Sequence, residues 1–215
     1  MEAAGAPRRD PTVGGREAAA EAQAGTGWTV ADPGPLGLAA FALTTFVLSM
    51  FNAELVSKAG EPIVLGVALA YGGLAQLLAG MWEFRTGNTF GAVAFTSFGA
   101  FWLSFWAFDA FYAKEITNKV DAGHAVGLYL IAWGIFTTYM FVASLRTTVA
   151  ISVVFALLAA TFLLLGIGNA GAHTSIVKLG GWFGLATAVA AWYASFAAVT
   201  NSTFGRTVLP VRPLK

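Results

Sequence analysis

Six long uncharged apolar segments determine the fold class of this chain. They cover residues 33–53, 62–82, 86–108, 125–145, 147–172 and 179–205. Each has about the 20 residues that a helix needs to cross a hydrocarbon core of about 30 Å. Only helices and closed barrels satisfy every backbone group in lipid, and these runs lack the two-residue alternation of barrel strands. The sequence therefore predicts an all-α integral membrane protein with six transmembrane helices in one bundle.

The composition excludes several other kinds of protein. Charged residues make up 11% of the chain, against about 25% in a soluble domain. The net charge of +1 offers no basic surface for nucleic acid. With no Cys and only two His, thiolate nucleophiles and His-rich metal sites lack their ligands. HExxH, nucleotide-loop and GxSxG motifs are also missing, so we expect no enzyme, no metal and no cofactor.

The segments around the six runs divide the chain into three parts. Residues 1–30 are rich in Ala, Gly, Pro and charge and are expected to form a disordered tail, 31–205 hold the helices, and 206–215 form a short polar C-terminal tail. Six crossings put both termini on one side of the membrane. That side receives Arg8, Arg9, Arg16, Arg85, Arg146, Arg206, Arg212 and Lys215, and the other receives Lys58, Lys114, Lys119 and Lys178. The positive-inside rule then predicts that both termini lie in the cytoplasm. The membrane is expected to be the plasma membrane.

Glycines at helical spacing predict close packing between helices. Gly66, Gly73 and Gly80 recur every seven residues in the second run, and Gly127 and Gly134 do so in the fourth. Small residues let helix backbones approach closely in lipid. These faces exceed what one six-helix bundle needs, which predicts an oligomer larger than a dimer.

Asp109 and Glu83 are expected near the ends of spans and Glu54 just beyond one, where contact with water is as good an explanation as a functional role. The candidate substrate pathway is formed by neutral polar side chains. The set is Thr44, Thr45, Asn52, Gln76, Asn88, Thr96 and Asn169. A Thr hydroxyl can simply bond back to its own helix, whereas amides in lipid need a partner helix or a water-filled path. Neutral donors bind weakly, as conduction requires. Such a pathway suits a small solute with an apolar part, and a monocarboxylate, ammonia, glycerol or water would all satisfy it.

Three separated stretches resemble one family. Residues 32–41 ("DPGPLGLAAF") follow the pattern Asn-Pro-x-Pro-Leu/Phe-Gly-Leu-x-x-Phe, with Asp32 in place of Asn. Residues 71–102 ("YGGLAQLLAGMWEFRTGNTFGAVAFTSFGAFW") and 204–210 ("FGRTVLP") match in the same order. In these blocks the chain resembles the acetate uptake transporter family, the succinate–acetate permeases.

The resemblance implies a hexamer of six-helix subunits, each with its own pathway for acetate and, in some members, succinate. It also implies a hydrophobic constriction of Phe, Tyr and Leu, which maps onto Phe41, Phe98 and Leu158. Phe98 stands where bacterial relatives often have Tyr, so one hydroxyl donor is missing. Aromatic residues also fill helix interfaces well, and core packing is the alternative role for Phe41 and Phe98.

The family signature also predicts a pathway entrance at the start of the first span. The entrance motif is Asp32, Pro33, Pro35, Leu36 and Gly37. The prolines fix backbone dihedrals and lack amide donors, so the helix begins around them. The free amides of its first turn carry partial positive charge and favour an anion. Asp32 would satisfy the same donors and repel acetate, or it serves as a plain N-cap.

The favoured interpretation is therefore an acetate transporter or channel whose partners are its small carboxylate substrate, membrane lipid and other copies of the chain. Two alternatives remain open. One is a non-transporting membrane protein of the same fold that acts in sensing or assembly, and the other is a channel for a solute such as ammonia. A filled, immobile constriction would favour the non-transporting protein.

Overall fold

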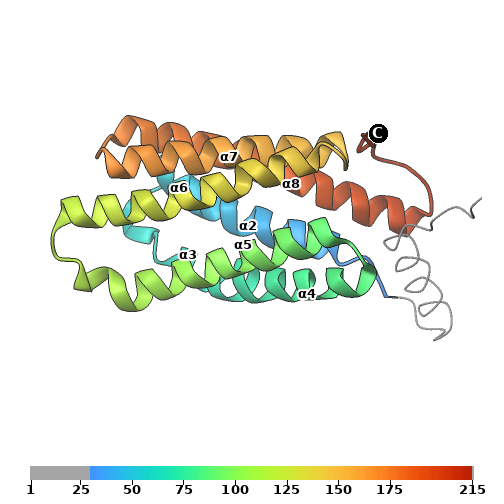
Figure 1. Cartoon of the computed structure of the whole chain (residues 1–215), viewed down its shortest axis with the longest axis horizontal. Coiled ribbons are helices and arrows are strands. Elements are labelled where there is room, and N and C mark those ends of the chain that lie inside the picture. The colour runs from blue at the N-terminus through green and yellow to red at the C-terminus, as the bar shows by residue number, and fades with distance from the viewer. Residues whose placement is uncertain (1–29, 215) are drawn as a thin grey trace, which may run out of the picture. The chain divides into compact units, whose positions relative to one another are not determined.

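The computed structural model describes residues 30–214, and in this part of the chain six helical segments are long and apolar enough to cross a membrane. They are α2 (Gly34–Asn52), Lys58–Thr86, Thr89–Glu115, α6 (Lys119–Ser144), α7 (Val149–Ala170) and α8 (Thr174–Phe204), shown in Figure 1. The six predicted spans are confirmed. The expected disordered tail lies, apart from its last residue, outside the described residues.

The second and third spans are composite helices. The second runs through a 3-10 turn η1 (Lys58–Gly60), α3 (Ile63–Val67), a π-helix η2 (Ala68–Ala75) and α4 (Gln76–Thr86). The third runs through α5 (Thr89–Ala107), a π-helix η3 (Phe108–Tyr112) and a 3-10 turn η4 (Ala113–Glu115). A π-helix is wider than an α-helix, so it shifts the face on which the following residues lie.

Side-chain caps and glycines set the ends of several helices. The side chains of Asn88, Asn118 and Thr148 accept backbone N–H bonds at the starts of α5, α6 and α7. These acceptors satisfy donors that the first helical turn leaves unpaired. α4 and α8 end at Gly87 and Gly205, whose φ angles of 77° and 63° are the left-handed conformation that glycine adopts most easily.

Glycine contacts bring the helices together. α6 and α7 meet where a Cβ on Gly127 would lie 2.9 Å from the carbonyl oxygen of Gly166. α8 meets the end of α2 at Gly181, where a Cβ would collide with the backbone of Ala53. Gly66 has open space around it within the subunit, whereas Gly73 and Gly80 closely approach Leu103 and Thr96 of α5. The π-helix between Gly66 and Gly73 explains why their seven-residue spacing does not keep them on one packed face.

Residues 206–214 pack against the helices. Val149 donates its backbone N–H to the carbonyl of Arg212 at 2.9 Å, and Leu214 donates to the carbonyl of Thr147 at 2.9 Å. The Tyr193 hydroxyl donates to Pro210 at 2.7 Å, and Asn201 accepts from Val208 at 2.7 Å. The segment predicted to be a polar tail is thus bound to the start of α7 and to the second half of α8.

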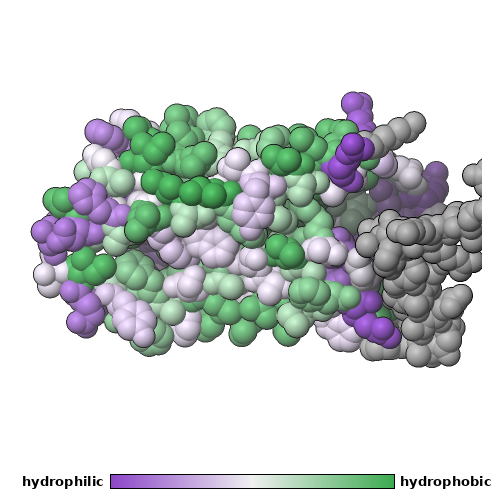
Figure 2. Space-filling model, in the orientation of Figure 1, coloured by the Kyte–Doolittle hydropathy of each residue, from purple (hydrophilic) through white to green (hydrophobic). Residues whose placement is uncertain are grey.

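The surface separates into apolar sides and polar ends. Figure 2 shows green side chains along the helices and purple ones gathered towards the helix ends on the face in view. Many large apolar side chains on α4, α6 and α8 are more than half exposed, among them Leu78, Leu128, Ile135, Val189 and Phe196. Exposed apolar faces of this kind suit lipid or another protein rather than water.

Candidate functional site: an apolar cavity closed by aromatic rings

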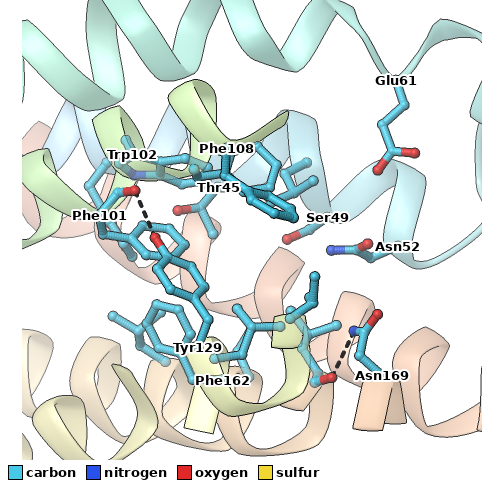
Figure 3. A pocket seen from close by; sticks show the side chains of 18 of the residues that line it. Thr45, Ser49, Asn52, Glu61, Phe101, Trp102, Phe108, Tyr129, Phe162 and Asn169 are labelled. Carbon is cyan, nitrogen blue, oxygen red and sulfur yellow. Dashed lines mark hydrogen bonds between the residues drawn. The ribbon is translucent and has the colours of Figure 1, made fainter. Parts of the chain in front are cut away.

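A cavity of about 370 Å³ lies between α2, α5, α6 and α7. It extends along α2 from Phe41 to Asn52 and along α7 from Leu158 to Asn169. The ends of α2 and α7 lie beside the loops 53–62, 113–118 and 171–173, and we call this end of the bundle the mouth end. Figure 3 shows polar side chains towards the mouth end and aromatic rings farther in.

α2 and α7 line the cavity with side chains at matching intervals. On each helix, the second, third and fourth lining residues follow the first by 4, 7 and 11 positions, which is the spacing of residues on one face of a helix. We call each set of four residues a stripe. The stripes are Phe41, Thr45, Leu48 and Asn52 on α2, and Leu158, Phe162, Leu165 and Asn169 on α7. Each stripe begins with an apolar side chain deep in the bundle and ends with an amide near the mouth.

The three predicted constriction residues belong to one buried cluster at the inner end of the cavity. Phe41 and Leu158 line the cavity and are 4% and 3% exposed. Phe98, 3% exposed, lies behind them with its ring centroid 5.8 Å from that of Phe41. We call Phe41, Phe98 and Leu158 the neck.

Phe98 is the centre of the aromatic packing around the neck. Its ring lies 5.4 Å from Phe136, 6.0 Å from Phe155 and 6.3 Å from Phe162, measured between centroids. Trp133 is a further neighbour at 6.1 Å. These four side chains come from α6 and α7, so the packing around Phe98 depends on helices other than its own.

Several polar side chains of the cavity wall already have hydrogen-bond partners within the protein. The Tyr129 hydroxyl donates to the carbonyl of Phe101 at 3.1 Å and lies 2.7 Å from the Ser104 hydroxyl. Asn169 donates to the carbonyl of Leu165 at 2.8 Å, as Figure 3 shows. Asn52 and Glu61 also line the cavity, and Figure 3 shows both towards the mouth end. Among the described residues that line the cavity, Glu61 is the one charged residue, and no Lys or Arg is present.

Comparison with known proteins places this architecture in a family. A model of the GPR1/FUN34/yaaH family matches residues 15–215. The chain belongs to this family. It is 40% identical to the succinate-acetate/proton symporter SatP of Escherichia coli K12 over 182 residues, which are 85% of the chain and 95% of SatP. The solved structure of the bacterial acetate channel SatP matches it with a TM-score of 0.79 at 39% identity, covering 85% of this chain and 99% of that one.

Fungal members of the GPR1/FUN34/yaaH family are longer proteins. Accumulation of dyads protein 2 of Saccharomyces cerevisiae is 47% identical over 80% of this chain and 62% of its own length. Acetate permease A of Emericella nidulans is 45% identical over 84% of this chain and 65% of its own length. The chain therefore spans less than two thirds of these fungal relatives.

Three of the candidate pathway residues lie on the cavity wall: Thr45, Asn52 and Asn169. The other four lie elsewhere. The Thr44 hydroxyl donates to the carbonyl of Ala40 at 2.9 Å in the interface with η2, and Asn88 caps α5. Gln76 is fully buried at the start of α4, and Thr96 packs against Gly80 of α4.

The family signature lies at the end of α2 opposite to the mouth end. Asp32 Oδ1 accepts the backbone N–H of Gly34 at 2.9 Å, so it fills one of the donors expected to attract an anion. Pro35 is held by the Ser195 hydroxyl, which donates to its carbonyl at 2.7 Å. A Cβ on Gly37 would lie 2.6 Å from the Phe95 ring, so this glycine is needed for packing. Pro33 is buried, Leu36 is exposed, and none of the five motif residues lines the cavity.

A buried carboxylate lies beside this signature. Glu83 is 2% exposed, and its Oε2 accepts a hydrogen bond from the Thr86 hydroxyl at 3.1 Å. A Cβ on Gly34 would lie 3.0 Å from Asp32 Oδ1 and 3.3 Å from Glu83 Oε1, so both carboxylates approach the first turn of α2. This end of the bundle therefore carries more negative charge than the family pattern, which has Asn in place of Asp32.

The cavity contains polar residues that sequence reasoning missed. Ser49, Glu61, Trp102, Tyr129 and Thr161 all line it. Helical spacing from Thr45 to Asn52 could have found Ser49, because the three share one face of α2. Glu61 lies outside the uncharged runs from which candidates were chosen, so its charge hid it.

Proposed function

We propose that the protein moves acetate and related small monocarboxylates across a membrane, through a pathway within each subunit. The observation that carries the proposal is the cavity: it lies within one chain, its wall has neutral donors, and it ends at the aromatic neck. We include succinate as a larger candidate substrate, because SatP of Escherichia coli is named a succinate-acetate/proton symporter. A role in transport, rather than catalysis, accords with these relatives.

The polar and apolar side chains of the cavity wall suit weak, transient binding of an anion. Amides near the mouth can replace part of the water around a carboxylate, and the apolar stripes accept its methyl group. A fixed Lys or Arg would hold the anion tightly and slow its release, whereas neutral donors do not. At the neck the anion must lose water, and this dry zone sets the barrier to passage.

The test is flux into vesicles that contain the purified protein. Vesicles with the protein should equilibrate labelled acetate faster than empty vesicles, and succinate more slowly than acetate. Running the assay with and without a pH gradient separates proton-coupled movement from passive conduction. Equal acetate rates in protein-containing and empty vesicles would refute the proposal, and faster ammonia flux under those conditions would support the ammonia channel instead.

We also propose a plasma-membrane location with Asp32 and the segment 206–214 facing the cytoplasm. Arg85, Arg146, Arg206 and Arg212 lie at that end of the described chain, whereas four lysines lie towards the mouth end, which supports this orientation. The mouth of the cavity would then face outward. A protease or thiol-labelling assay on a cysteine introduced at Lys178 or Arg206 would decide the orientation, since the chain has no natural Cys.

We further propose that the subunits assemble as a hexamer. The exposed apolar side chains on α4, α6 and α8 and the open space at Gly66 support contacts outside the subunit. Mass measurement that subtracts bound detergent should give a particle larger than a dimer. A monomer in several mild detergents would contradict the assembly without affecting the proposed pathway.

A further inference from the structure

We propose that the Thr45 hydroxyl and the Trp102 indole N–H form a carboxylate-binding subsite immediately on the mouth side of the neck. Both residues line the cavity, and both side chains are nearly buried, at 6% and 2% exposure. Neither Thr45 Oγ1 nor Trp102 Nε1 has a hydrogen-bond partner among residues 30–214. The inference rests on the proposed function and names the place where the substrate is held.

Thr45 differs from four other buried threonines of the bundle; the hydroxyl of Thr96 also lacks a partner, but Thr96 does not line the cavity. A threonine in a membrane helix usually satisfies its hydroxyl by donating to the carbonyl four residues earlier. Four buried threonines do this, at distances of 2.7 to 2.9 Å: Thr44, Thr137, Thr161 and Thr187. The Thr45 hydroxyl has no such bond and lies on the cavity wall. A buried unpaired donor is unfavourable, so this hydroxyl is suited to a ligand that supplies an acceptor.

Trp102 determines the chemistry of that ligand. An indole nitrogen can donate a hydrogen bond but cannot accept one. The ligand must therefore present an acceptor here, which excludes ammonium, a donor only. A carboxylate has two oxygens and can accept from Trp102 and Thr45 at once. The neighbouring hydroxyl of Tyr129 is already engaged with Ser104 and Phe101, so it does not compete.

The two donors lie one helical turn from two neck residues. Thr45 follows Phe41 by four positions on α2, and Trp102 follows Phe98 by four positions on α5. Residues four apart lie on one face of a helix, one turn along it. Both helices run towards the mouth end at these positions, so both donors lie just before the neck as seen from the mouth. Figure 3 shows the two side chains from α2 and α5 in the aromatic part of the cavity.

The surroundings limit the size of the ligand. Phe41, Phe101, Phe162 and Leu158 line the cavity beside the donors and offer only apolar contacts to the rest of the molecule. A short carboxylic acid anion with one apolar end, such as acetate or propionate, satisfies both requirements. A dicarboxylate would place its second charge against these rings, which is unfavourable. The subsite thus favours monocarboxylates over succinate.

The experiment compares matched substitutions in the full-length protein in vesicles and detergent. Thr45→Val removes the hydroxyl at constant shape, and Thr45→Ser keeps it. Thr137→Val is the control, because Thr137 is buried and back-bonded but does not line the cavity. Losing a hydrogen bond to a charged group should raise the KM for acetate about tenfold in Thr45→Val. Thr45→Ser and Thr137→Val should stay within about twofold of the native KM.

Trp102→Phe tests the second donor, with Trp192→Phe as its control, since Trp192 packs outside the cavity. Trp102→Phe should raise the KM for acetate about tenfold. The double variant Thr45→Val/Trp102→Phe should lose less than the product of the two single effects, because both donors act on one carboxylate. In 15N-labelled native protein, acetate but not acetamide should shift the indole N–H resonance that Trp102→Phe removes.

Distinct outcomes separate this inference from the proposed function. If Thr45→Val and Thr45→Ser have the same KM and the indole resonance does not respond to acetate, the subsite is overturned even though acetate flux persists. If Trp102→Phe does not fold, the pair of Thr45 variants decides. If the native protein moves no acetate, the proposed function fails, and the indole titration still reports whether a carboxylate binds.

Discussion

Replacing Phe98 by Tyr should have opposite effects on stability and on transport. The change restores the hydroxyl that bacterial relatives often carry, and it places that hydroxyl among the rings of Phe41, Phe136, Phe155 and Phe162. In the empty protein a buried hydroxyl without a partner costs about 1–3 kcal/mol, so the free energy of unfolding should fall. While a carboxylate passes the neck, the same hydroxyl gains an acceptor.

The expected gain in flux follows from these magnitudes. A hydrogen bond to a charged carboxylate contributes about 1.5–3 kcal/mol net, which is about ten- to a hundredfold in rate if it acts only at the barrier. The Phe98→Tyr variant should therefore move acetate about ten- to a hundredfold faster, without a change in the order of acetate, propionate, butyrate and succinate. The measurement is vesicle flux normalised to folded protein, together with thermal unfolding in detergent.

A matched control isolates the neck from general burial. Phe51→Tyr introduces the same hydroxyl at a residue that is 6% exposed but does not line the cavity. It should lower stability and leave flux unchanged. If Phe98→Tyr behaves like Phe51→Tyr, with lower stability and native flux, Phe98 is core packing and the barrier lies elsewhere.

Three further predictions test other parts of the structure. Phe41→Ala and Leu158→Ala should widen the neck and admit longer carboxylates, at a loss of about 2–5 kcal/mol of stability; unchanged selectivity in both would contradict the neck. Gly181→Ala should lower the unfolding temperature because its Cβ would collide with the backbone at the end of α2, whereas Gly66→Ala, which has open space within the subunit, should leave the fold of the subunit unchanged and test only contacts between subunits. Asp32→Asn should raise acetate flux about two- to threefold at low salt, and the gain should shrink as salt screens the charge; a salt-independent effect would argue against electrostatics.

Sequence reasoning predicted the spans well because charge and length decide them. A charge-free run of about 20 residues has one stable form in lipid, so residues 33–53 and 147–172 could be assigned as transmembrane helices from the sequence. The helix ends were harder to place. α6 begins at Lys119, and α8 begins before Lys178, because helices continue into the polar zone beyond the hydrocarbon core.

The cavity wall was only partly predictable. Thr44 and Thr45 are adjacent in sequence and identical in chemistry, yet one lies in a helix interface and the other on the wall. The two side chains point in directions about 100° apart around α2. Which of them faces the cavity depends on where the neighbouring helices lie, and the sequence does not show this. Gln76 lies directly after the π-helix, which no pattern in the sequence predicted, so the face of the helix on which Gln76 lies could not be predicted either. Trp102 was missed although it lies one turn from Phe98, where helical spacing could have found it.

The binding of segment 206–214 to α7 has a consequence for how the protein is made. The first turn of α7 cannot obtain two of its acceptors from its own helix, and Val149 and Ala150 take them from Arg212 and Val211. During synthesis, all six helices leave the ribosome before these acceptors do. A chain that stops before Pro210 should therefore insert fully and yet keep an open, protease-sensitive start of α7, so the folding of the subunit is completed by the docking of this segment and not by the insertion of a helix.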